Sequence, residues 1–154
     1  MRRTTFPARK RAFAWAAPAA LLLVAAAPTG AWADPALDYV LNCQGCHLPD
    51  GAGTAGKVPP LKDHVARFLW LPEGRAFLVQ VPGVARSALP DDRIAALMNW
   101  LVLRFDADHV PKSFKPYTSD EVARLRRHPR TEVAAYRARL LAKIAAIESG
   151  DGAP

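Results

Sequence analysis

The stretch Cys43-Gln44-Gly45-Cys46-His47 contains both cysteines of this 154-residue chain. Two thiols at C-x-x-C spacing, followed at once by a histidine, form the pattern to which c-type haem is attached. Each thiol can add to one vinyl group of the porphyrin, and the imidazole of His47 can then ligate the iron. The pattern predicts one covalent haem c, with Cys43 and Cys46 as its attachment points and His47 as the proximal axial ligand.

A thioredoxin-like dithiol or a local disulfide is the alternative use of the two cysteines. A dithiol of that type lies in a βαβ unit. The segments after the motif are rich in glycine and proline and give no indication of such a unit. We therefore favour haem attachment.

The first 33 residues have the organisation of a secretory signal peptide. A basic start leads into a small, apolar segment over 12–27, and Ala31-Trp32-Ala33 is a small-x-small cleavage pattern. The apolar run is shorter than the roughly 20 residues that a membrane span needs, and Pro18 and Pro28 interrupt or end it. We therefore favour cleavage after Ala33 over an uncleaved anchor. Export to the periplasm, with no membrane span after cleavage, is the expectation.

The net charge of +7 comes mostly from this leader. Residues 1–33 hold five of the 21 Lys and Arg and none of the 14 Asp and Glu, so the remaining chain has a net charge of +2. The basic balance is a targeting feature and gives no reason to expect nucleic-acid binding. About 120 residues remain, which is enough for one domain.

A short helix and a glycine-rich loop flank the motif. Asp34 and Pro35 suit the N-cap and first turn of a helix. The loop after the motif must turn tightly and can approach another group closely, because it holds three glycines within six residues: Gly51, Gly53 and Gly56.

The order of these features resembles the class I, monohaem cytochromes c. Helix, C-x-x-C-H, Asp-Gly-x-Gly from Asp50, and Gly-x-x-Pro-x-Leu over 56–61 follow one another as in that family. The family packs an aromatic residue four before the first cysteine against an aromatic of its last helix, and Tyr39 and Trp100 match these positions. The resemblance covers residues 35 to about 104. It implies a mostly α-helical domain around one covalent haem.

Further haem contacts are implied by the same resemblance. A family proline carbonyl accepts a hydrogen bond from the proximal histidine, which fixes one imidazole nitrogen and presents the other to iron. Pro59 matches that proline. The alternative is that Pro59 only shapes the backbone of the loop. Arg75 and Arg86 are candidate partners for haem propionates, because guanidinium matches carboxylate geometry. We favour an ordinary surface position for both.

Helices account for most of the rest of the chain. The last core helix is expected over 91–103, and the apolar runs at 68–71 and 76–81 are too short for periodicity to decide between helix and strand. Residues 105–154 lie outside the resemblance and predict a C-terminal helical extension, with a capping box at 118–121 and Thr131 as a second cap. One apolar stripe runs along its final helix: Val133, Tyr136, Leu140 and Ile144. We favour helices that strap the core over a docking surface for an acidic partner, although the two are compatible.

The ligand opposite His47 decides whether the haem transfers electrons or binds a small molecule. A thioether there saturates the iron and suits electron transfer, whereas an open position admits a small molecule. The family places its distal methionine before the last helix, but residues 82–89 hold neither methionine nor histidine. Met98 ranks first among the residues that could be the distal axial ligand and His64 follows, and an open site is the remaining alternative. Two further histidines are expected at the surface: His109 and His128.

The sequence thus predicts a signal peptide over 1–33, a cytochrome c domain over 34–104 and an extension over 105–154. The expected function is a periplasmic one-electron carrier between redox proteins, and not an enzyme. Two alternatives stay open. One is a haem electron-relay subunit of a periplasmic dehydrogenase or oxidase complex, with the extension as interface. The other is a five-coordinate haem enzyme acting on a small ligand.

Overall fold

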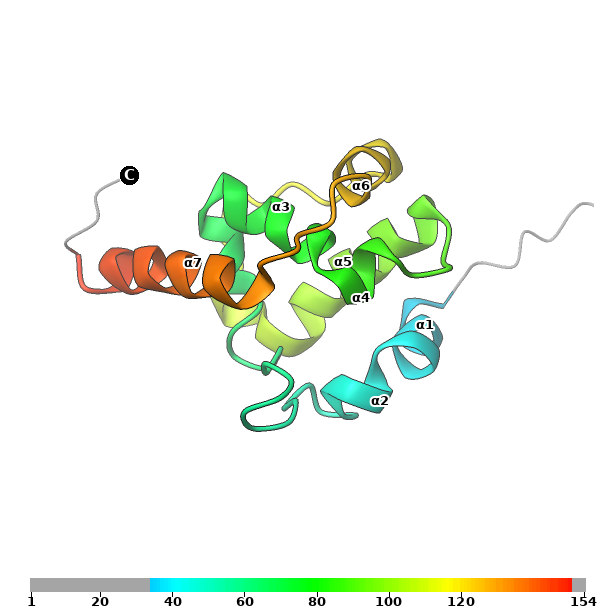
Figure 1. The fold of residues 1–154 in the computed structure, drawn as a ribbon, viewed down its shortest axis with the longest axis horizontal. Helices are drawn as coiled ribbons and strands as arrows, with labels where there is room; N and C mark the ends of the chain where they lie inside the picture. The colour runs from blue at the N-terminus through cyan, green and yellow to red at the C-terminus, as the bar shows by residue number, and fades with distance from the viewer. Residues whose placement is uncertain (1–33, 151–154) are drawn as a thin grey trace, which may run out of the picture. The chain divides into compact units, whose positions relative to one another are not determined.

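The computed structural model describes residues 34–150, so the predicted leader and its cleavage site lie outside the described part. The described residues belong to one compact unit (Figure 1). They form, in order, α1 Pro35–Asn42, α2 Gln44–His47, η1 Ala66–Trp70, α3 Pro72–Gln80, α4 Pro82–Ala85, α5 Asp91–Asp106, η2 Ala107–His109, α6 Ser119–Arg126 and α7 Val133–Glu148. Between residues 34 and 150 the only extended pairing is an isolated bridge of Thr54 with Val58. The mostly α-helical prediction is confirmed.

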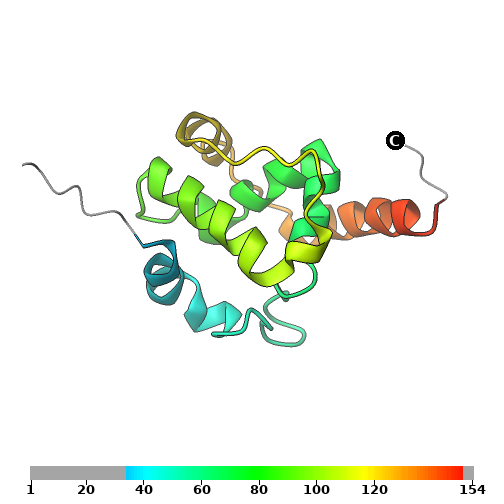
Figure 2. The same ribbon diagram turned by 180° about the vertical axis from the view of Figure 1, so that it is seen from behind.

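Helix α5 is the central element, with α1 packed on one side and α6 on another. Figure 2 shows it crossing the molecule, with α1 and α2 below and α3 behind. Tyr39 of α1 is 2% exposed and packs against α5. Its ring centroid lies 5.7 Å from that of Trp100 and 5.0 Å from that of Phe105. The aromatic pair that the resemblance implied is therefore present.

The segment between the glycine loop and α5 is helical. Its two apolar runs fall in η1 and α3, which pack together. A Cβ at Gly74 would lie 2.2 Å from the carbonyl oxygen of Phe68, so only a glycine allows this close approach. Length alone could not decide the conformation of these runs, and the packing of α3 on η1 decides it.

The C-terminal extension packs onto the core. Leu140 and Ile144 of the predicted stripe are buried against Phe68 and Phe77. The hydroxyl of Thr118 accepts the N–H of Glu121 at 3.2 Å, which confirms this cap. The expected cap at Thr131 is wrong, because Glu132 is the N-cap of α7 and no side chain caps it. Four ion pairs join extension and core: Arg75–Glu121, Lys143–Glu73, Arg67–Glu148 and Arg126–Asp91.

Arg126 of α6 makes the densest of these contacts. Its guanidinium donates to the backbone carbonyls of Ala85 at 3.2 Å, Leu89 at 2.9 Å and Ser87, and to the carboxylate of Asp91 at 2.9 Å. The side chain is 18% exposed. One cation of the extension thus fixes the whole turn between α4 and α5.

We expect Arg126→Met to lower the free energy of unfolding by about 3 kcal/mol, because charge-assisted hydrogen bonds to three carbonyls are lost and the acceptors stay half-buried. Urea unfolding followed by far-UV circular dichroism measures it. Arg124→Met is the matched control on the same helix, where the exposed side chain predicts a change within about 0.5 kcal/mol. Equal effects of the two substitutions would contradict the role of Arg126.

Candidate haem-attachment site

The C-x-x-C-H motif forms one tight helical turn directly after α1. The N–H of Cys43 donates to the carbonyl of Tyr39 at 2.9 Å, and the N–H groups of Cys46 and His47 both donate to the carbonyl of Cys43, at 3.1 and 3.0 Å. Both thiols are free, with Cys43 half-buried and Cys46 exposed. The described residues contain no βαβ unit, so the thioredoxin-like alternative has no support in the fold.

The environment of Cys43 keeps its thiol protonated. Burial raises the pKa of Cys43, and the carboxylate of Asp38 and the neighbouring Cys46 raise it further. Asp38 is itself fully buried and accepts hydrogen bonds from the guanidinium of Arg93, one of them at 3.1 Å. The side chain of Cys43 also packs against the cluster around Tyr39. This thiol is therefore held in place beside the core.

His47 has the properties of a neutral metal ligand. Burial lowers the pKa of His47 below its ordinary 6.5, and a hydrogen-bonding contact with the backbone carbonyl of Pro59 opposes this without reversing it. Nδ1 is buried, and among the described residues it has no hydrogen bond of ordinary geometry. A neutral imidazole is the form that binds metals. The contact of the Pro59 carbonyl with the imidazole is the one that the resemblance implies. It favours this role over a proline that only shapes the loop.

The glycine loop brings Pro59 to the motif. The N–H of Gly53 donates to the carbonyl of His47 at 3.1 Å. Gly53 has a φ of +69°, and a Cβ there would lie 2.4 Å from the carbonyl oxygen of Val58 and 2.7 Å from that of Pro59. A side chain at this position would push the Pro59 segment away from His47. Glycine is required here both for the backbone conformation and for the space.

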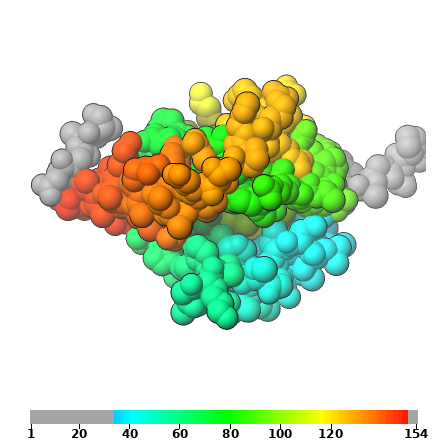
Figure 3. All heavy atoms as spheres, in the orientation of Figure 1, coloured from blue at the N-terminus to red at the C-terminus, as the bar shows by residue number. Residues whose placement is uncertain are grey.

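One face of the molecule is hollowed beside the motif. In Figure 3 a groove runs between the cyan to teal segment, from α1 to the glycine loop, and the green and orange helices α4 and α7. At the loop, a pocket of about 490 Å³ is lined by Ala52, Ala55, Gly56, Lys57, Val58, Pro59, Pro60 and Arg137. The free thiols, the half-buried imidazole of His47 and the adjacent groove together fit a haem that is covalently attached at the motif.

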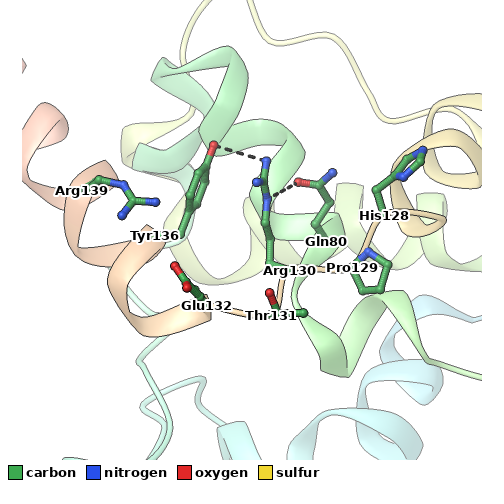
Figure 4. A pocket seen from close by; sticks show the side chains of 8 residues that line it. All are labelled: Gln80, His128, Pro129, Arg130, Thr131, Glu132, Tyr136 and Arg139. Atoms are coloured by element: carbon green, nitrogen blue, oxygen red, sulfur yellow. Dashed lines mark hydrogen bonds between the residues drawn. The ribbon is translucent and has the colours of Figure 1, made fainter.

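A second pocket, of about 320 Å³, lies where the chain enters α7 (Figure 4). There the side chain of Arg130 donates to Oε1 of Gln80 at 2.9 Å and lies 4.1 Å above the ring of Tyr136. None of the C-x-x-C-H residues lines this pocket. It shows how the extension is fastened to the end of α3.

The candidate distal ligands are dispersed. Met98 of α5 is 3% exposed and belongs to a buried cluster with residues of α3 and α6. Its neighbours in this cluster include Val79, Ile94, Tyr117 and Val122. His64 and His128 are exposed, whereas His109 is half-buried, contrary to the surface expectation for it. Both ring nitrogens of His109 are engaged, Nδ1 with Asp106 and Nε2 with Arg67 at 3.0 Å. The distal role of Met98 stays a prediction, and its packing favours a core role instead.

The arginines are arranged differently from the sequence expectation. Arg75 is neither a propionate partner nor a solvated side chain, because its guanidinium binds the carboxylate of Glu121 with two hydrogen bonds of 2.7 Å. Arg86 is exposed. Sequence reasoning missed the contacts of Arg126 with the turn between α4 and α5 and the position of Arg137 beside the glycine loop. Nothing in the local pattern distinguishes these two from the solvated arginines around them.

Comparison with known proteins gives two similar relatives. One cytochrome c-552 of Thermus thermophilus is 36% identical over 114 residues, covering 62% of this chain and 76% of that protein. A second cytochrome c-552 of Thermus thermophilus is 36% identical over 112 residues, covering 61% and 85%. The chain belongs to the class I c-type cytochromes. No protein-family model matches it.

As a c-type cytochrome, the protein is an electron carrier of a family whose cofactor is covalent haem c and whose partners are redox proteins. The aromatic contact of Tyr39 with Trp100 and the Pro59 loop agree with that membership. Within residues 34–150, no helix has the length and apolar character needed to cross a membrane.

We expect Gly53→Ala to impair both folding and haem attachment in this cytochrome, because its Cβ would collide with two backbone carbonyls. Gly56→Ala is the matched control. Gly56 has a similar φ of +71° but open space around its Cβ, so a loss of only about 1 kcal/mol is expected. Thermal unfolding and the yield of covalent haem on a denaturing gel are the measurements. If the two variants behave alike, the close approach at Gly53 does not matter.

Proposed function

We propose that this cytochrome carries one electron at a time between periplasmic redox proteins, with haem c attached at Cys43 and Cys46 and His47 as the proximal ligand. When bound, haem c supplies the Fe(III)/Fe(II) couple. The observation that carries the proposal is the single helical turn on which two free thiols and a neutral, half-buried imidazole come together.

Each residue of the turn has a separate role. Cys43 and Cys46 would hold the haem, because the S–H of each could add across a vinyl double bond, with sulfur bonding to one carbon and the proton going to the other. The contact of the Pro59 carbonyl with the ring of His47 would orient the imidazole for ligation of the iron. Tyr39 anchors the turn to α5, which would hold these groups in place when the iron changes its oxidation state.

A contact surface beside the motif suits exchange with partner proteins. Helix α1 exposes Leu37 at 51%, Val40 at 49% and Leu41 at 70%. These positions share one helical face, and an exposed apolar patch of this kind favours protein contact. The proposal includes export by the leader over 1–33, a haem domain over 34–104 and an extension over 105–154.

The intact mass of the exported protein tests export and attachment together. We expect a chain that begins at Asp34 and carries the mass of one haem. The double variant Cys43→Ser with Cys46→Ser should be exported without covalent haem, because no thiol remains. A haem-free wild-type protein with a Cys43–Cys46 disulfide would instead support the dithiol alternative.

A second candidate is a five-coordinate haem that binds a small ligand. It is favoured by the packing of Met98 in the core and by the engagement of both nitrogens of His109. Residues 82–89, where the family carries its distal methionine, hold neither methionine nor histidine.

The variant Met98→Leu tests the distal assignment. From the packing we expect an unchanged absorption spectrum in both oxidation states and a loss of less than about 1.5 kcal/mol in unfolding free energy, as for a swap of similar volume. Loss of the low-spin spectrum would establish Met98 as the distal ligand. Binding of carbon monoxide by the ferrous wild type would favour the five-coordinate candidate, and its absence would favour the simple carrier.

A further inference from the structure

Arg137 of α7 is a half-buried cation that lacks a carboxylate partner among residues 34–150. Among the described residues, four arginines pair with acids: Arg67, Arg75, Arg93 and Arg126. Arg130 is held by the side chain of Gln80 instead, and Arg137 is in none of these pairs. Its guanidinium carbon lies 5.8 Å from the centroid of Phe68, a weak contact. Burial lowers the pKa of Arg137 with no opposing effect from an acid. A guanidinium in this position can accept an anion as a further partner.

The pocket next to Arg137 has the chemistry of an anion site. Of the residues that line its roughly 490 Å³, Arg137 and Lys57 carry positive charge and none is acidic. The other lining residues are small or apolar and come from the glycine loop. Guanidinium binds carboxylates with two parallel hydrogen bonds, and an ammonium group can add a third contact.

The pocket also adjoins the proximal histidine. Its wall includes Pro59, whose carbonyl acts on the ring of His47. In the same loop, the N–H of Gly53 donates to the carbonyl of His47. In Figures 1 and 3 the first turns of α7, in orange, lie next to this loop, in teal. None of the C-x-x-C-H residues lines the pocket itself, and Pro59 is the residue that links it to the proximal histidine.

We propose that Arg137, assisted by Lys57, binds a propionate carboxylate of the haem. This rests on the proposed function, since haem c brings two such carboxylates to the motif. The extension then contributes a positioning residue to the haem site. A positive charge close to the haem favours the ferrous over the ferric state.

The holoprotein variants Arg137→Gln and Arg137→Lys test this by redox titration. At a fixed electrode potential we expect Arg137→Gln to lower the Fe(II) to Fe(III) ratio about tenfold, with an unchanged absorption spectrum, because one nearby charge is lost. Arg137→Lys keeps the charge and should restore most of the ratio. Arg139→Gln is the matched control, since Arg139 is exposed on the same helix and makes the same charge change.

Three results would overturn the inference. Equal shifts for Arg137→Gln and Arg139→Gln would show a general charge effect, and a wild-type ratio in Arg137→Gln would show a purely structural side chain. A wild-type ratio that depends on inorganic phosphate at constant ionic strength, and loses this dependence in Arg137→Gln, would assign the pocket to a free anion. A wild-type protein without covalent haem would refute the proposed function as well, whereas these three results leave it standing.

Discussion

The contact of Tyr39 with helix α5 is the interaction on which the site depends. Its ring packs on Trp100 and Phe105, and its hydroxyl donates to the carbonyl of Leu48 at 2.6 Å. Burial raises the pKa of Tyr39 to about 12, so the hydroxyl remains a donor at any physiological pH. Since Leu48 directly follows the motif, one side chain fixes the chain before and after the C-x-x-C-H turn. The thiols and the imidazole are thereby held at a fixed distance from the core.

The extension completes the environment of that turn. Arg126 binds the segment between α4 and α5 from one side, and Arg75 of α3 binds back to Glu121 of α6. Helix α7 then brings Arg137 against the glycine loop. Residues of the extension therefore contact both the loop that orients His47 and the loop where the family keeps its distal ligand. A strap that only stabilised the core would not need charged side chains at these two places.

The sequence predicted the features that depend on local chemistry. The cysteine motif, the Asp34 and Thr118 caps, the Tyr39–Trp100 pair and the apolar stripe of α7 all follow from spacing or from the resemblance. Runs of four to six apolar residues at 68–81 carry too few periods to decide a conformation. The partner of an arginine is harder still to predict from sequence. Its long side chain can reach several groups, and only the tertiary fold brings these groups close to it. Arg75, Arg126 and Arg137 look alike in sequence and have three different environments.

The contacts of Arg126 have a consequence for the distal ligand of the haem. The turn between α4 and α5 presents three of its carbonyls to Arg126, so its backbone is committed to the extension. A turn held in this way cannot swing to carry a side chain toward iron, and it has no thioether or imidazole to carry. Ala85, whose carbonyl accepts a hydrogen bond from the guanidinium of Arg126, is buried. A distal ligand from this chain would therefore have to come from elsewhere, either from Met98 by leaving its packing in α5 or from the exposed His64.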